Sequence, residues 1–138
     1  MMMKRILGIG LAVLVALGAG WVWGASGKSE IDRALKSAEL RESLLEGRGA
    51  VLDARLDIYS VNFGTASRHL EAARAALHAA DAQLGALGRA DDSKRLAVAF
   101  TRIDEAQRMA GLLSQDANSL AADAAKAIDE VLASSAGR

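Results

Sequence analysis

The hydrophobic pattern begins with an uncharged apolar run that covers residues 6–27. At about 1.5 Å per residue, a helix of this length spans roughly 33 Å, enough to cross a hydrocarbon core of about 30 Å. Lys4 and Arg5 precede the run, and Trp21 and Trp23 lie near its end, where indole rings favour the headgroup region. The pattern therefore predicts one transmembrane helix at 6–27, after a short basic stub at 1–5.

A cleaved signal peptide is the competing interpretation, because a basic start, an apolar run and small residues around Gly24 also suit a signal peptidase. The run is longer than the usual apolar core of about 7–15 residues. We therefore expect an uncleaved signal anchor. The basic stub favours a cytoplasmic N-terminus and an extracytoplasmic, periplasmic C-terminal domain, although basic residues after the run argue for the opposite orientation.

Small residues recur at every fourth position of this run: Gly8, Ala12, Ala16, Gly20 and Gly24. Such a stripe allows two helices to approach closely in lipid. Glycine and alanine are also common in membrane helices in general. The stripe is therefore either a helix-packing surface or a result of this common composition.

Residues 28–138 are expected to form a water-soluble helical domain. Its first part, with a helix at about 29–46, contains two apolar rows with helical spacing. The first row is Ile31, Leu35, Ala38, Leu45, Leu52, Leu56, Tyr59 and Phe63, interrupted by Glu42 and Gly49. The second row is Leu40, Leu44, Val51, Ala54, Ile58 and Val61. Together the rows predict one wide buried face that contacts more than one neighbouring helix.

Glycines and capping residues mark the expected helix ends. A second helix is predicted over 50–87. A break is permitted at 47–49, between the first two predicted helices, and another at 62–65, within the second. A reversal is predicted at 85–93, where Gly88 suits a helix end and Asp91, Asp92 or Ser93 suits the next helix start. The sequence therefore predicts a helix–turn–helix at this point.

The last helix is predicted over 92–133, because eleven apolar positions follow one another at intervals of three and four without a polar interruption. We expect this helix to be continuous and to form a coiled coil. The alternative is a break at 114–118, where capping residues cluster. The row contains the following helix-packing candidates: Leu96, Ile103, Ala110, Leu113, Leu120 and Val131. The predicted fold is all-α, either a long antiparallel helical hairpin or a small three- to four-helix bundle.

Composition supports this class and excludes several functions. The chain has no proline and is 4% aromatic, which favours long helices. Beyond Lys4 and Arg5, 15 basic residues remain against 17 acidic ones, so the basic stripe of a nucleic-acid-binding protein is missing. Cysteine is absent, which excludes disulfides and thiolate chemistry.

Candidate chemistry is sparse. His69 and His78 lie nine residues apart, so they point to opposite faces of one helix and cannot share a metal within it. Most carboxylates alternate with basic residues at helical spacing, as on a solvated face. Four residues remain as possible partner or pocket contacts: Glu42, Tyr59, Phe63 and His69. We expect no enzyme activity and no cofactor.

The function expected from these patterns is a membrane-anchored helical scaffold or accessory subunit. It would bind membrane lipid through 6–27, and a membrane-protein partner or further copies of itself through its helix faces. The alternative is a small extracytoplasmic sensory or ligand-binding bundle, with Glu42, Tyr59 or His69 inside the bundle.

Overall fold

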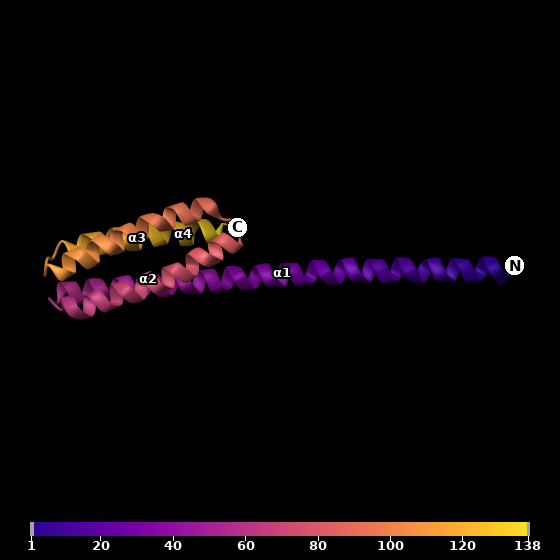
Figure 1. Cartoon of the computed structure of the whole chain (residues 1–138), viewed down its shortest axis with the longest axis horizontal. Coiled ribbons are helices and arrows are strands. Elements are labelled where there is room, and N and C mark those ends of the chain that lie inside the picture. The colour runs from indigo at the N-terminus through magenta and orange to yellow at the C-terminus, as the bar shows by residue number, and fades with distance from the viewer. Residues whose placement is uncertain (1, 138) are drawn as a thin grey trace. The chain divides into compact units, whose positions relative to one another are not determined.

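The computed structural model describes the backbone of residues 2–137 and the side chains of residues 27–137. Within that range the chain forms four α-helices: α1 (Met2–Tyr59), α2 (Phe63–Ala86), α3 (Ala90–Gly111) and α4 (Ala117–Ala136) (Figure 1). It divides into two compact units, Met1–Leu35 and Lys36–Arg138. The expected all-α class is therefore confirmed, and the second unit is a small helical bundle.

Each helix of this bundle runs antiparallel to the next. α2 packs against α3, and α3 packs against α4. Between α1 and α2, Gln83 Nε2 donates a hydrogen bond to Glu39 Oε2 (3.1 Å). Between α1 and α4, Arg55 Nε donates a hydrogen bond to Asn118 Oδ1 (2.9 Å). Since α1 borders both α2 and α4, the architecture is a closed up-down-up-down four-helix bundle rather than a long hairpin.

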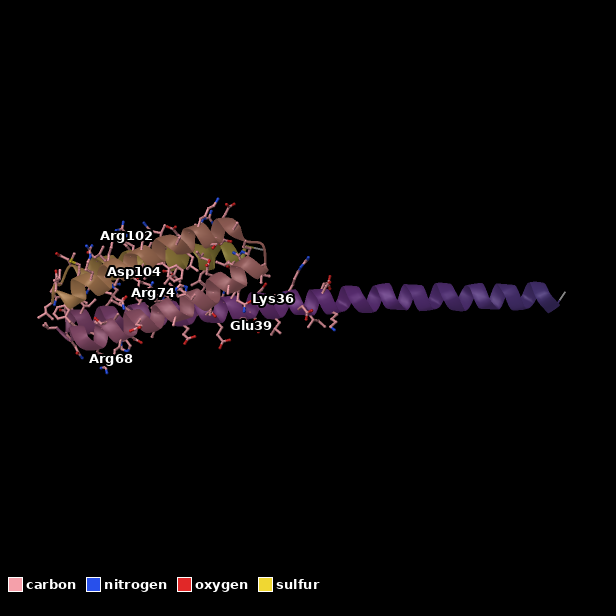
Figure 2. All side chains as sticks on the ribbon, in the orientation of Figure 1. Lys36, Glu39, Arg68, Arg74, Arg102 and Asp104 are labelled. Atoms are coloured by element: carbon pink, nitrogen blue, oxygen red, sulfur yellow. The ribbon has the colours of Figure 1, made fainter. Side chains whose placement is uncertain are left out.

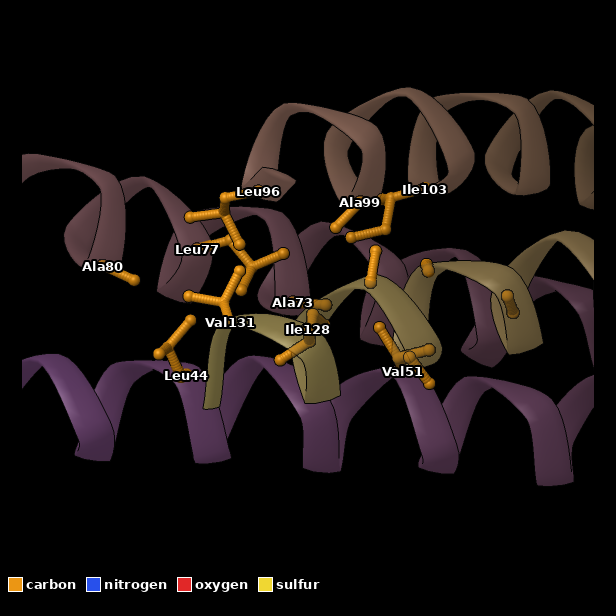
Figure 3. Packing of buried hydrophobic residues seen from close by; sticks show 14 of the residues in the cluster. Leu44, Val51, Ala73, Leu77, Ala80, Leu96, Ala99, Ile103, Ile128 and Val131 are labelled. Atoms are coloured by element: carbon orange, nitrogen blue, oxygen red, sulfur yellow. The ribbon is translucent and has the colours of Figure 1, made fainter. Parts of the chain in front are cut away.

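Side chains from all four helices meet in one core. Figure 3 shows Leu44 and Val51 of α1 near Ile128 and Val131 of α4, with Leu77 of α2 beside them. Many of the other core residues are alanines: Ala73, Ala80, Ala99, Ala106, Ala121 and Ala124. Because alanine side chains are small, the helix axes can lie close together.

The two apolar rows of α1 do not form one wide face, which corrects the sequence-based interpretation. The row that is buried in the core is Leu40, Leu44, Val51, Ala54 and Ile58. The other row lies on the outside of the bundle at Ala38, Leu45, Leu52, Leu56 and Tyr59, where only Leu52 is partly buried. At about 100° per residue the two rows lie roughly 130° apart, so one helix cannot bury both against the same neighbours.

α1 continues without a break through Gly47 and Gly49, where the sequence permitted an interruption. A Cβ atom on Gly47 would lie 2.7 Å from Leu77 Cδ2 and 3.0 Å from Leu77 Cγ. Gly47 therefore allows α1 to approach α2 at this point. At Gly49, apart from the adjacent residues and local backbone of α1, no described atom lies within 4 Å of the position that a Cβ would occupy.

This difference predicts opposite effects for two matched substitutions. Gly49→Ala is expected to raise the free energy of unfolding by about 1 kcal/mol, since alanine is the better helix former. Gly47→Ala brings the same gain but overpacks buried Leu77, which costs about 1–3 kcal/mol, so this variant is expected to be destabilised. Thermal unfolding of the full chain in detergent, followed by circular dichroism, measures both. A stabilised Gly47→Ala variant would contradict the close approach of α1 to α2.

The C-terminal part of the chain forms two helices, not the single helix expected over 92–133. α3 ends at Gly111 and α4 begins at Ala117, so the break falls at the cluster of capping residues. Ser114 Oγ accepts a hydrogen bond from Asp116 N (3.2 Å), and Ser119 Oγ donates one to Asp116 O (2.9 Å). If α3 continued beyond Gly111, it would extend past the end of α2. The reversal instead brings the apolar residues of α4 back to the core.

The predicted membrane helix and its features fall outside the described side chains, apart from Gly27. These features are Lys4, Arg5, Trp21 and Trp23, and the small-residue stripe of Gly8, Ala12, Ala16, Gly20 and Gly24. In the part of the chain that the structure describes with side chains, no helical stretch combines the length and the apolar character needed to span a bilayer.

Candidate interaction surface

α1, α2 and α3 each end in a Schellman motif, in which two backbone N–H groups bond back to the last helical turn. At the end of α1, Val61 N donates a hydrogen bond to Ile58 O (3.0 Å), and Asn62 N donates one to Asp57 O (2.7 Å). The residue in the position of Val61 must adopt a left-handed backbone conformation. The φ angle of Val61 is accordingly +61°.

The end of α3 repeats this geometry with another bulky residue. Leu113 N donates a hydrogen bond to Ala110 O (3.0 Å), and Ser114 N donates one to Met109 O (3.0 Å). Leu113 has a φ of +56°; in the described residues, only Leu113 and Val61 combine a side chain with positive φ. Left-handed backbone costs a residue with a Cβ about 1–2 kcal/mol.

The end of α2 shows how this cost is avoided. There Gly88 has the left-handed conformation, with a φ of +68°. Gly88 N donates a hydrogen bond to Gly85 O (3.1 Å), and Arg89 N donates one to Leu84 O (2.9 Å). Glycine carries no Cβ penalty, so this turn is unstrained.

The two strained turns lie at the same end of the bundle, opposite the Gly88 turn. Figure 1 shows the α1–α2 and α3–α4 connections side by side at this end. Gln115 Nε2 of one connection donates a hydrogen bond to Ile58 O beside the other (2.8 Å). We call Val61, Leu112 and Leu113 the apical residues.

The apical residues expose their side chains to solvent. Val61 is 66% exposed, Leu112 is 70% exposed and Leu113 is 71% exposed. Directly beneath them is a small buried cluster of Ile58, Phe63, Ala66, Ala110 and Ala117. The bundle therefore places three apolar side chains on a well-packed end.

The opposite end of the bundle contains a buried polar network centred on Asp92 of α3. Arg89 Nε donates a hydrogen bond to Asp92 Oδ2 (2.7 Å), and Arg95 Nη1 donates one to Asp92 Oδ1 (3.0 Å). Ser134 Oγ of α4 donates a hydrogen bond to Asp92 Oδ1 (2.7 Å). The carboxylate is thus paired and hydrogen-bonded, and its local role is to join the Gly88 turn, α3 and α4.

Charged side chains surround the outside of the bundle, and several link neighbouring helices (Figure 2). Arg74 of α2 and Asp104 of α3 form an ion pair (3.3 Å). Arg48 Nε donates a hydrogen bond to Asp129 Oδ1 (2.5 Å), and this bond together with the carboxylate charge raises the pKa of the Arg48 guanidinium above its ordinary value. All four side chains are substantially exposed, so each pair adds little to stability.

The two histidines have separate local partners. His69 Nδ1 lies 2.8 Å from Asp57 Oδ2, between α2 and the end of α1. The ring of His78 packs on that of Phe100, with 4.6 Å between centroids. Within residues 27–137, no group of three histidine or carboxylate side chains is placed to hold a metal ion.

The other residues singled out in the sequence fall into three environments. Glu42 and Tyr59 are exposed on α1, while Phe63 is buried in the cluster beneath the apical residues. Four members of the predicted helix-packing row are buried: Leu96, Ile103, Ala110 and Val131. Leu120 is partly buried, and Leu113 lies in the α3–α4 turn with an exposed side chain because the row is interrupted there.

Sequence reasoning missed the apical residues and the buried state of Asp92. The usual signal for a left-handed helix end is glycine or asparagine, and Val61 and Leu113 are neither. Asp92 was one of three residues expected to cap α3, but the N-cap of α3 is Arg89, which has no side-chain capping bond. Comparison with protein families, with curated proteins and with solved structures gave no match, so the function must be inferred from this chain's own residues.

Proposed function

We propose that this chain is a single-pass, membrane-anchored helical scaffold or accessory subunit that binds a protein partner of a membrane complex. Residues 6–27 form the anchor, with Lys4 and Arg5 on the cytoplasmic side and the bundle on the extracytoplasmic, periplasmic side. The uncharged length of the run and its basic and tryptophan flanks support the anchor.

The apical residues are the docking site in this proposal. The observation that carries it is the use of Val61 and Leu113 where glycine would serve, as Gly88 does in the third turn. Each bulky residue combines backbone strain with an exposed apolar side chain, and both are unfavourable in the isolated chain. Strain and exposed apolar groups that coincide on a rigid surface are typical of a site that contacts another molecule.

The sensory or ligand-binding alternative depends on polar groups inside the bundle. Glu42 and Tyr59, which were expected to supply them, lie on its outside, and His69 is only partly buried. The buried carboxylate, Asp92, is already bonded to Arg89, Arg95 and Ser134. The scaffold is therefore the better supported function.

Replacing both strained residues with glycine separates stability from binding. The variant Val61→Gly/Leu113→Gly is expected to raise the free energy of unfolding by about 1 kcal/mol, because the Cβ penalty exceeds the added flexibility. The same variant should lose its partner. A photo-crosslinking amino acid at Leu112, introduced in cells that express the protein, reports partner contact as a discrete adduct in membranes.

The control places the crosslinker at Val98, an exposed apolar residue on α3, where no adduct is expected. The proposal requires that the Leu112 adduct disappears in the glycine variant although the bundle becomes more stable. An adduct of equal yield in the glycine variant would contradict the apical docking site, as would the absence of any adduct at Leu112.

A further inference from the structure

The outer row of α1 has the spacing of a coiled-coil seam. Within the bundle unit, seven positions recur at alternating intervals of four and three, which is the repeat of a helix that packs along a single partner helix. These positions, called here the α1 seam, are Ala38, Glu42, Leu45, Gly49, Leu52, Leu56 and Tyr59. In the sequence the same register continues back to Leu35 and Ile31, which are also exposed.

The α1 seam is exposed at every position except Leu52, which is partly buried against the bundle core. Leu45 is 46% exposed and Tyr59 is 80% exposed, and the residues of α1 that enter the bundle core lie on a different face of the helix. Two shallow hollows open along the seam. One is lined by Ala38, Arg41, Glu42, Leu45 and Glu46, and the other by Leu52, Arg55, Leu56, Tyr59 and Asn118. Apolar residues alternating with hollows are the surface that knobs-into-holes packing requires.

The charges that flank the α1 seam identify the partner and its direction. A basic residue immediately precedes each of the seam positions 42, 49 and 56: Arg41, Arg48 and Arg55. An acidic residue immediately follows each of the seam positions 38, 45 and 52: Glu39, Glu46 and Asp53. In a parallel pair of identical helices, a residue of the first set faces a residue of the second set five positions further along the other chain. Arg41 then meets Glu46 of the second copy, and Arg48 meets Asp53.

An antiparallel pair of the same helices would place basic residues opposite basic residues and acidic opposite acidic, which is unfavourable. Of the two pairs, the charges of Arg41 and Glu46 are available. Among the described side chains, neither Arg41 nor Glu46 forms an ion pair within the chain, whereas Arg48 is bound to Asp129. The bundle already holds α1 in helical form, so association has little ordering cost.

We propose that the α1 seam binds the α1 seam of a second copy of this chain as a parallel, in-register, two-stranded coiled coil. This surface runs along the side of the bundle, separate from the apical residues. Pairing requires no other protein, so it can fail without affecting the apical docking site, and the reverse also holds.

Two residues of the α1 seam limit the strength of this pairing. The two Glu42 carboxylates face each other in register, and Gly49 leaves a gap where a side chain would fill a hole. Because Glu42 is exposed in the single chain, replacing it does not disturb the bundle. Glu42→Leu is therefore expected to tighten the dimer about tenfold or more, measured by sedimentation equilibrium of the full chain in detergent.

The absence of cysteine makes a direct test of register possible. Leu45→Cys and Leu52→Cys, each as the only cysteine in the full chain, place identical residues opposite each other in the proposed dimer. Mild oxidation in detergent should convert both variants to covalent dimers, because the paired Cβ atoms then lie within disulfide reach. Val98→Cys, which is exposed on α3, is the control and should form no covalent dimer.

A charge exchange tests the direction of pairing. Arg41→Glu or Glu46→Arg alone should weaken the dimer about tenfold, and the double variant Arg41→Glu/Glu46→Arg should restore it. Crosslinking at only one of the two seam cysteines, equal crosslinking at Val98→Cys, or a double variant as weak as the single ones would each overturn the proposal. Crosslinking at both seam positions together with charge rescue would establish it.

Discussion

Asp92→Ala is expected to lower the free energy of unfolding by about 3 kcal/mol, because it breaks a buried ion pair. Asp92 is 1% exposed and accepts hydrogen bonds from Arg89, Arg95 and Ser134. Its removal leaves the Arg89 guanidinium, whose side chain is only 14% exposed, without a counter-charge. Thermal unfolding of the full chain in detergent measures the loss.

The neighbouring carboxylate supplies a matched control. Asp91 also lies in the first turn of α3, but its side chain is 87% exposed and it contacts only Lys94 at 3.7 Å among the ion pairs of the described residues. Both substitutions remove one negative charge from the start of the same helix. Asp91→Ala is expected to change stability by less than about 0.5 kcal/mol. Equal losses in the two variants would show that the helix dipole, and not the buried network, accounts for the effect.

Leu77→Ala is expected to lower the free energy of unfolding by about 3 kcal/mol, through lost burial and the cavity left behind. Leu77 is fully buried on α2 and packs against the backbone of α1 at Gly47. The neighbours of this cavity are held by the core of a closed bundle and can relax only in part. Unfolding of the full chain in detergent gives the magnitude.

The same pair of residues permits a double-mutant cycle. In the Leu77→Ala background a Cβ atom at Gly47 no longer meets the leucine, so Gly47→Ala changes from destabilising to stabilising. The expected coupling between the two sites is about 2 kcal/mol. Additive effects would mean that α1 and α2 do not meet through these two residues.

The helical class and one reversal could be predicted from local signals alone. The absence of proline and the apolar rows of helical period indicate long helices, and the structure is all-α. The reversal at 85–93 is realised around Gly88 because glycine without a Cβ is the default residue of a left-handed helix end. At that position the local preference and the fold agree.

The reversal between α3 and α4 was only the alternative prediction, because its left-handed residue is Leu113. An uninterrupted apolar row favours a continuous helix, and Leu113 fits that row as well as it fits the turn. Only the presence of α1 beside α4 makes the reversal favourable, since it buries Ala117 and Val131 in the core. This information lies in contacts between distant parts of the sequence.

The two rows of α1 could not be ranked from the sequence for a related reason. Both rows have the same spacing. The row with large apolar residues such as Leu56 and Tyr59 lies outside the bundle, so side-chain size does not identify the buried row. Gly47 marks the inner row, because a close approach to Leu77 requires a residue without a Cβ. The role of Asp92 likewise depends on Ser134, 42 residues away.

The proposed function depends most directly on residues 6–27 being anchored in lipid. Alkaline extraction of membranes from cells that express the native chain tests this. The account predicts that the intact polypeptide of 14.4 kDa stays in the membrane fraction. Release of a chain that begins after Gly24 into the aqueous fraction would contradict the membrane anchor.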